Sequence, residues 1–151
     1  MRLRTLLASA VALVAALGGL AAPAPASAAA PVIMITKIWY DSPGTDRGAN
    51  ASLNAEYVQL RNTTRTRRSL TGWTVRDTAR HVYTFGTFNL NAGATVTLRT
   101  GIGTNTATNR YWGRRAYVWN NDRDTAILRN ASGVQIDSCA YNSTRYDYRN
   151  C

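Results

Sequence analysis

Histidine and cysteine are scarce in this chain of 151 residues, which contains one His and two Cys. His81 stands alone, so no group of imidazoles is available to bind a transition metal, and no C-x-x-C pair suggests a zinc or redox site. The sequence also has no glycine-rich phosphate loop and no G-x-S-x-G nucleophile motif. These absences argue against the common classes of metalloenzyme, nucleotide-binding enzyme and serine hydrolase.

Acidic residues are also few, and they form no recognisable calcium loop. Asp41 and Asp46 share one expected loop, and Asp122 and Asp124 share another, each with an arginine beside the carboxylates. Calcium requires roughly six to eight oxygen ligands, and neither pair has the spacing of a calcium loop. We therefore expect these side chains to make turns and caps, with calcium binding as the alternative.

A catalytic alternative rests on His81. Asp77 lies four residues before it and Arg80 is adjacent, so a small nuclease or hydrolase could use His81 as its general base. One His without a metal cluster is a weak indication, and a structural histidine in a hairpin turn explains the pattern equally simply. We expect no catalytic residue, no cofactor and no metal, and therefore a binding or structural protein rather than an enzyme.

The first 28 residues predict export. Arg2 and Arg4 form a positive segment, residues 6–20 are apolar, and an Ala-Ser-Ala run at 26–28 is a cleavage site for signal peptidase, with 24–26 as a second one. A membrane anchor needs about 20 strongly apolar residues, more than this Ala- and Gly-rich stretch provides. We expect residues 1–28 to be removed and the mature protein to be secreted, without a transmembrane segment. The Ala-rich style is typical of bacteria.

The mature chain is small and basic. Roughly 120 residues remain, enough for one domain. Once Arg2 and Arg4 are removed, 16 basic groups face 8 acidic ones, which leaves a net charge of +8. Such a charge favours anionic partners such as nucleic acid, envelope polymers or lipid head groups, although it can also serve solubility alone.

The two cysteines, Cys139 and Cys151, predict a disulfide. An even cysteine count in an exported protein favours pairing. The bond would close a loop of about a dozen residues and stabilise the fold by roughly 3 kcal/mol. It would tie the polar tail, residues 142–151, back onto the last strand.

From residue 31 onward, short alternating runs of β-branched and aromatic residues are separated by clusters of Gly, Asn, Asp and Ser. This rhythm predicts an all-β sandwich of seven to eight antiparallel strands. We expect strands at 32–40, 56–62, 70–77, 82–85, 95–99, 116–120, 124–129 and 134–141, with a polar loop at 45–54 and a flexible segment at 101–111. The predicted core comprises Ile33, Ile35, Val58, Leu60, Trp73, Val75, Phe85, Val96, Leu98, Trp119, Leu128 and Ile136.

Two arginine-rich segments are the best candidates for a binding site. Arginine next to exposed aromatic rings can hold phosphates and stack on nucleic-acid bases. A solvated loop whose charges only keep the protein soluble is the alternative. The candidate residues for binding a polyanion are Arg61, Arg65, Arg67, Arg68, Arg110, Trp112, Arg114 and Arg115.

Several short motifs occur along the chain in a fixed order. Residues 38–44 read Ile-Trp-Tyr-Asp-Ser-Pro-Gly, and residues 54–62 read Asn-Ala-Glu-Tyr-Val-Gln-Leu-Arg-Asn. Further motifs follow at 70–73, 83–85, 118–121, 124–126 and 133–137. The ordered set resembles the lamin tail domain, which is found in lamins and as a separate module in exported bacterial proteins. The resemblance places the domain at 29–141 and implies an immunoglobulin-like sandwich.

The function implied by this resemblance is binding rather than catalysis. Members of the family look like docking modules for proteins, nucleic acid or envelope components, and the resemblance transfers no catalytic residue to this chain. We therefore expect a secreted, non-catalytic binding or structural module whose partner is an extracellular protein, an envelope component or a polyanion. A nucleic-acid-binding accessory factor that uses the basic loops, and a small extracellular nuclease, are the alternatives.

Overall fold

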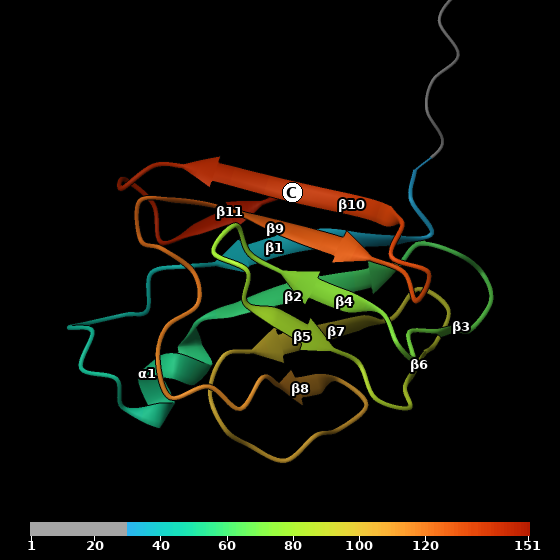
Figure 1. Cartoon of the computed structure of the whole chain (residues 1–151), viewed down its shortest axis with the longest axis horizontal. Helices are drawn as coiled ribbons and strands as arrows, with labels where there is room; N and C mark the ends of the chain where they lie inside the picture. The colour runs from blue at the N-terminus through green and yellow to red at the C-terminus, as the bar shows by residue number, and fades with distance from the viewer. Residues whose placement is uncertain (1–29) are drawn as a thin grey trace, which may run out of the picture.

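The computed structural model describes residues 30–151. The predicted signal peptide, residues 1–28, and its cleavage sites lie outside the described residues. Within the described part, two β-sheets pack face to face around a hydrophobic core (Figure 1). This arrangement confirms the predicted all-β, immunoglobulin-like sandwich.

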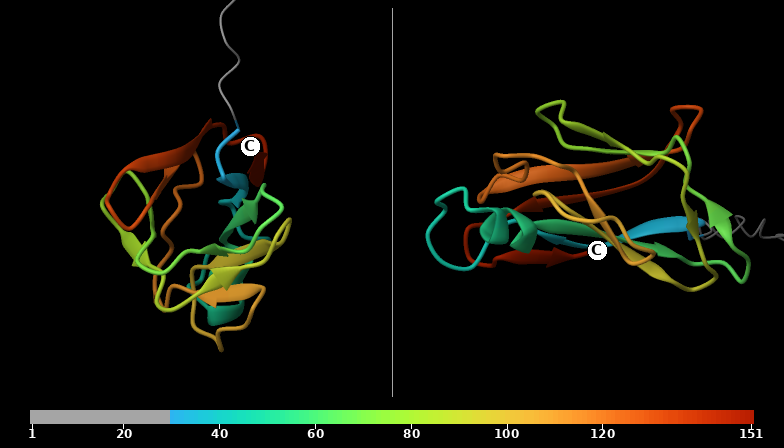
Figure 2. Two further views of the ribbon diagram at one scale, coloured as in Figure 1. Left: turned by 90° about the vertical axis from the view of Figure 1, so that its right-hand side faces the viewer. Right: turned by 90° about the horizontal axis from the view of Figure 1, so that it is seen from below.

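The two sheets differ in size. The five-stranded sheet has the order β11-β1-β2-β7-β8, and the four-stranded sheet has the order β10-β9-β4-β5. Figure 2 shows the sheets as separate layers, with β10 and β11, both drawn in red, at the same side. Their strands are β1 (Ile33–Trp39), β2 (Tyr57–Asn62), β4 (Thr74–Arg76), β5 (Val82–Thr84), β7 (Thr95–Arg99), β8 (Asn109–Tyr111), β9 (Arg123–Arg129), β10 (Gln135–Asn142) and β11 (Tyr148–Asn150).

Two small elements complete the domain. A two-stranded pair, β3 (Arg68–Ser69) with β6 (Asn89–Leu90), lies beyond the end of β2. A short helix, α1 (Asn50–Ala55), precedes β2 and lies at the other end of the same sheet (Figure 1). The sequence predicted only a polar loop over most of the helix, because six residues carry too little helical periodicity to be recognised.

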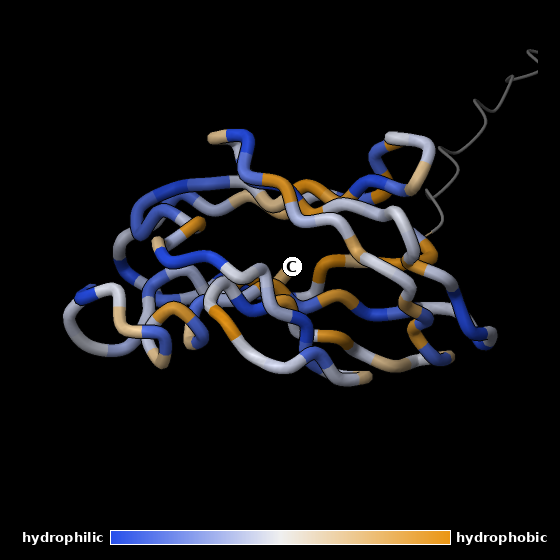
Figure 3. Tube along the Cα trace, turned by 60° about the horizontal axis from the view of Figure 1, so that its bottom comes forward, coloured by the Kyte–Doolittle hydropathy of each residue, from blue (hydrophilic) through white to orange (hydrophobic). Residues whose placement is uncertain are grey.

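The core follows from alternation along the long strands. In β2, β7 and β9, buried residues alternate with partly or fully exposed ones, as expected when each strand has one face in the core. Figure 3 shows hydrophobic and hydrophilic positions interleaved along the chain. Of the twelve predicted core residues, Trp73 and Ile136 are the two that are only partly buried.

The predicted segments 116–120 and 101–111 also differ from the structure. Residues 116–120 do not form a strand, although Val118 and Trp119 are buried. The backbone N–H of Val118 donates instead to the Glu56 carboxylate, so a side chain takes the place of a neighbouring strand. Residues 101–111 contain β8, which pairs with β7 in parallel rather than antiparallel orientation.

The loop that leads into β8 packs closely against neighbouring side chains at two glycines. Gly101 is buried, and an added Cβ there would approach the side-chain oxygens of Asn50 and Asn54. At Gly103, an added Cβ would overlap the ring of Tyr111. Glycine at both positions therefore lets residues 100–108 fold back so that β8 can lie alongside β7.

The predicted Cys139–Cys151 disulfide is present. The sequence predicts that the tail lies on the last strand. Instead, the tail forms β11 on the opposite sheet, where it pairs with β1. The backbone N–H of Cys151 donates to the carbonyl oxygen of Thr36 in β1 at 3.0 Å. The disulfide therefore joins the edges of the two sheets.

Among residues 30–151, no helix has the length and apolar character that a membrane crossing requires.

Candidate functional site

The loop after β2 is shaped by one buried amide. Asn62 is fully buried, and its Nδ2 donates to the carbonyl oxygens of Thr66, Leu90 and Asn91 at 2.8–3.0 Å. Its Oδ1 accepts hydrogen bonds from the backbone N–H and the hydroxyl of Thr64. A side chain that satisfies several loose backbone groups fixes the path of the loop. Residues 63–67 are thus held against β6 rather than left free.

This loop carries the first predicted arginine cluster. Arg61, Arg65, Arg67 and Arg68 are all exposed. The two ion pairs within residues 30–151 are His81–Asp77 and Arg123–Asp122, so none of the four arginines is paired with a carboxylate. Guanidinium groups that lack a carboxylate partner are available to bind phosphate or another anion. We refer to these four residues as the arginine loop.

The second predicted cluster is built differently. The guanidinium of Arg110 lies 4.0 Å from the ring centroid of Phe88, and its Nε is buried. Trp112 is only partly exposed because its ring packs against Trp119 and Tyr83. The structure therefore leaves Trp112 only partly exposed between the arginines, because the rings of Trp119 and Tyr83 cover part of it.

Arg114 and Arg115 lie apart from the arginine loop, whereas Arg110 packs on Phe88, whose carbonyl oxygen accepts the backbone N–H of Leu70. The backbone N–H of Arg114 donates to the carbonyl oxygen of Thr100. The backbone N–H of Thr100 in turn donates to the carbonyl oxygen of Glu56, which immediately precedes β2. The arginine loop follows the other end of β2. Six strand residues separate these ends by about 20 Å. Arg114 and Arg115 therefore belong to a different part of the surface from the arginine loop.

Asp77 and His81 close the turn between β4 and β5. The buried Asp77 carboxylate accepts the backbone N–H of His81 at 2.7 Å, and its second oxygen lies 2.5 Å from His81 Nδ1. Arg80, between them, has a φ of 72°, a left-handed conformation that a tight turn requires. Both groups thus serve the hairpin. Within residues 30–151, no three His, Cys, Asp or Glu side chains lie close enough to hold a metal ion.

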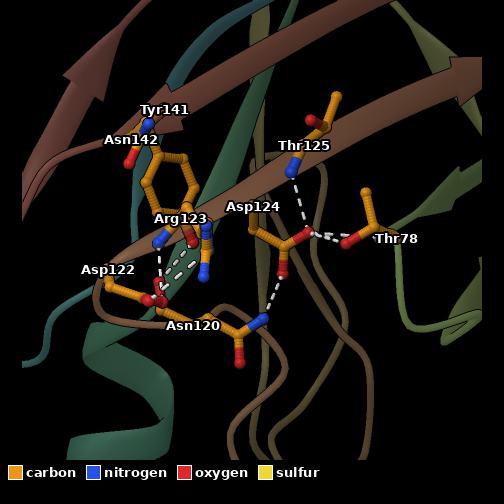
Figure 4. Close-up of a pocket in the computed structure, with 8 residues that line it drawn as sticks. All are labelled: Thr78, Asn120, Asp122, Arg123, Asp124, Thr125, Tyr141 and Asn142. Atoms are coloured by element: carbon orange, nitrogen blue, oxygen red, sulfur yellow. Dashed lines mark hydrogen bonds and ion pairs between the residues drawn. The ribbon is translucent and has the colours of Figure 1, made fainter.

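A polar pocket of about 540 Å³ lies where the 120–122 loop meets β9 and β10 (Figure 4). Its buried carboxylate, Asp124, accepts hydrogen bonds from Thr78, Asn120 and the backbone of Thr125. The hydroxyl of Tyr141 donates to the carbonyl oxygen of Asn120 at 2.6 Å. These contacts hold the 120–122 loop to both neighbouring strands, although Asp124 itself lies in β9 rather than in the loop predicted for it.

The other acidic pair is bridged by an amide. The Nδ2 of Asn121 donates to Asp41 at 3.1 Å and to Asp46 at 2.8 Å. Burial, followed by the nearby charges of Asp46 and Asp147, raises the pKa of Asp41. The Asn121 amide, a neutral donor, therefore bridges the two carboxylates.

Glu56 is the buried acid that sequence reasoning missed. Its Oε1 accepts the hydroxyl of Thr100 at 2.6 Å and the backbone N–H of Val118 at 2.9 Å, whereas its Oε2 is buried without a partner. Burial is the main cause that raises the pKa of Glu56 to about 7. The sequence does contain a sign of this burial, because Glu56 lies two residues before Val58 and four before Leu60, on the strand face that these buried residues share.

Comparison with known proteins agrees with the fold. The family model described as Lamin Tail Domain matches residues 26–143, which is most of the chain. The match ends before β11 and Cys151. No curated protein matches the chain.

Proposed function

This chain belongs to the lamin tail domain family, and on that premise we propose that it is a secreted, non-catalytic module that binds a polyanionic partner through the arginine loop. The partner classes that fit this chemistry are acidic envelope polymers and nucleic acid, because both present closely spaced anionic groups.

The arginine loop is the observation that carries this proposal. Four exposed guanidinium groups, unpaired with carboxylates, lie on a loop whose shape Asn62 fixes. A loop that is already ordered loses little conformational entropy on binding. The excess of basic over acidic groups across the chain adds a long-range attraction for the same kind of partner.

Other features support the non-catalytic and extracellular parts of the proposal. Asp77 and His81 are engaged in a turn, and Glu56 is buried beneath the 116–120 segment. A disulfide between Cys139 and Cys151 is typical of proteins in oxidising compartments outside the cytoplasm.

Salt-dependent binding tests the arginine loop directly. Affinity of the secreted protein for a labelled mixed-sequence DNA duplex, and for heparin, would be measured over a range of salt concentrations. The triple variant R65A/R67A/R68A should weaken binding to both ligands and flatten the dependence of log affinity on log salt. The matched control, R47A/R123A/R145A, removes three exposed arginines that belong to neither predicted cluster.

The control decides how a loss is interpreted. Equal weakening by the two triple variants would mean that diffuse charge, rather than the arginine loop, attracts the polyanion. If the protein binds neither ligand at low salt, the arginines serve solubility, and the partner is to be sought among proteins or neutral envelope components.

A further inference from the structure

An aromatic row crosses the outer face of the five-stranded sheet. Tyr148, Trp39 and Tyr57 are directly paired residues on the neighbouring strands β11, β1 and β2. The ring centroids of Tyr148 and Trp39 are 5.1 Å apart, and those of Trp39 and Tyr57 are 5.9 Å apart. We call these three residues the aromatic row.

Basic side chains lie at both ends of the aromatic row. The Lys37 Nζ is 4.5 Å from the ring centroid of Tyr148 and 5.8 Å from that of Trp39. Arg99, paired with Tyr57 on the next strand, places its guanidinium 5.6 Å from that ring. Each cation therefore sits within the range of a cation–π contact.

This face is open to solvent and carries charge of one sign. Ile38 and Val58, which neighbour the row along their strands, are buried and point into the core, so the row faces outward. Tyr148 is 40% exposed, and Trp39 and Tyr57 are partly exposed. None of the five strands of this sheet contains an Asp or Glu.

The row depends on a segment outside the family match. That match ends at residue 143, whereas Tyr148 comes from β11. Pairing with β1 and the Cys139–Cys151 disulfide bring this tail onto the sheet. The complete row is therefore a feature of this chain and not only of the part that matches the family.

Sheet stability alone does not explain the arrangement. Cross-strand aromatic pairs do stabilise sheets, but such pairs need no surrounding cations and no exclusion of carboxylates. Lys37 and Arg99 belong to no ion pair within residues 30–151. Flat apolar rings combined with unneutralised positive charge are complementary to a ligand that repeats a flat ring and an anion.

We propose that the aromatic row, with Lys37 and Arg99 beside it, binds single-stranded nucleic acid. Bases contact the rings and phosphates contact the cations, which is the combination used by surfaces that bind single strands without sequence preference. Neighbouring ring centroids lie more than 5 Å apart, wider than the ~3.4 Å rise per base of a duplex, so bases that each contact one ring are spaced more widely than in a stacked helix.

The site continues into the arginine loop but does not depend on it. Arg61, the member of the arginine loop that lies in β2, is on the same face as Tyr57, and the other three arginines follow immediately after that strand. A strand lying across the sheet can therefore extend its phosphates toward the loop. Stacking on the row and charge on the loop are separable because they involve different residues.

Variants that remove a ring but keep an apolar side chain test the row. The full secreted protein would be titrated against fluorescein-labelled dT20, a duplex of equal length and heparin. Tyr148→Leu and Trp39→Leu should each weaken dT20 binding about tenfold, the scale of one base–aromatic stack, and leave heparin binding unchanged. Trp39→Phe, which keeps a ring, should retain most of the affinity.

Tyr146→Leu is the matched control. Tyr146 is an exposed tyrosine of the same tail with a nearby arginine, Arg145, at 5.3 Å, but it lies on no strand. The Tyr146→Leu variant should bind dT20 with the same affinity as the unsubstituted protein. Circular dichroism of each variant would confirm that the sheet is intact, and Tyr148→Leu, at the exposed edge, tests the proposal even if Trp39→Leu fails to fold.

The outcomes separate this site from the arginine loop. If the arginine loop is the polyanion site, the R65A/R67A/R68A variant weakens binding to duplex and heparin. This result does not depend on whether the aromatic row binds dT20. Unchanged dT20 affinity in Tyr148→Leu, an equal loss in Tyr146→Leu, or a loss for heparin as large as that for dT20 overturns the proposal for the row. The last result would mean that the row binds anionic polymers in general rather than single-stranded nucleic acid.

Discussion

The Oε1 of Glu56 accepts the backbone N–H of Val118 across 62 residues of chain, at 2.9 Å. The same oxygen accepts the hydroxyl of Thr100, the residue that follows β7. One carboxylate thus joins the start of β2, the end of β7 and the 116–120 segment. This contact makes the protonation of Glu56 a determinant of stability.

Stability is expected to fall as pH rises from about 4.5 to about 7. Burial raises the pKa of Glu56 from its ordinary value of 4.5 to about 7, so in this window the folded protein keeps a proton that the unfolded chain has lost. The free energy of unfolding therefore decreases with pH, by about 3 kcal/mol in total, and then levels off. Urea unfolding between pH 4 and pH 8 measures this slope. Glu56→Gln should flatten it, and an unchanged slope would assign the pH dependence to other groups.

Asp77→Ala and His81→Ala are expected to differ in stability. Removing the buried Asp77 carboxylate breaks its bonds to both the backbone and the ring of His81, at a cost of about 1–3 kcal/mol. His81→Ala keeps the backbone bond and should cost about 1 kcal/mol or less. Urea denaturation compares them. Loss of a measurable nuclease activity in a folded His81→Ala protein would favour the catalytic alternative instead.

Asn62→Ala should weaken polyanion binding without removing any charge. The substitution leaves the Leu90 and Asn91 carbonyls without their partner and frees the arginine loop, with a stability loss of about 2 kcal/mol. Ordering the loop then opposes binding, so heparin affinity should fall. Asn89→Ala, at an exposed position of β6, is the control and should change neither quantity. Unchanged heparin affinity in Asn62→Ala would show that loop order is irrelevant to binding.

Removing the disulfide should affect both stability and the aromatic row. The double variant C139S/C151S opens a link with a sequence separation of 12 and should lower the free energy of unfolding by about 3 kcal/mol. Because β11 then rests on its pairing with β1 alone, Tyr148 is held less firmly and dT20 affinity should drop. Thermal melting and the dT20 titration measure the two effects. Full dT20 affinity in the variant would show that strand pairing suffices.

The long strands could be predicted because their pattern is local. Alternation alone located β2, β7 and β9, since each strand shows one face to the core over five or more residues. The strands β8 and β11 have three residues each, too few to show a period, and β11 also depends on β1, a partner distant in sequence. Segment 116–120 was misassigned because a burial pattern does not reveal that a carboxylate supplies its hydrogen bond.

The candidate sites divide in the same way. The arginine loop could be read directly, because polar residues between two strands lie on the surface wherever the strands pack. The partial burial of Trp112 could not be predicted from the sequence, because it depends on packing against Trp119 and Tyr83 from other segments. Trp39 and Tyr57 are visible in the sequence, but Tyr148 joins them only through strand register.

Because the disulfide joins the two sheets at one side only, the two sides of the sandwich should differ in how readily the sheets separate. At the β10–β11 side a covalent bond prevents the sheets from separating. At the other side, where β5 and β8 are the edge strands, the sheets meet through noncovalent contacts such as the packing of Tyr83 on Trp112. Transient opening should therefore begin at β5 and β8, and their amide hydrogens should exchange with deuterium before those of β1 and β9.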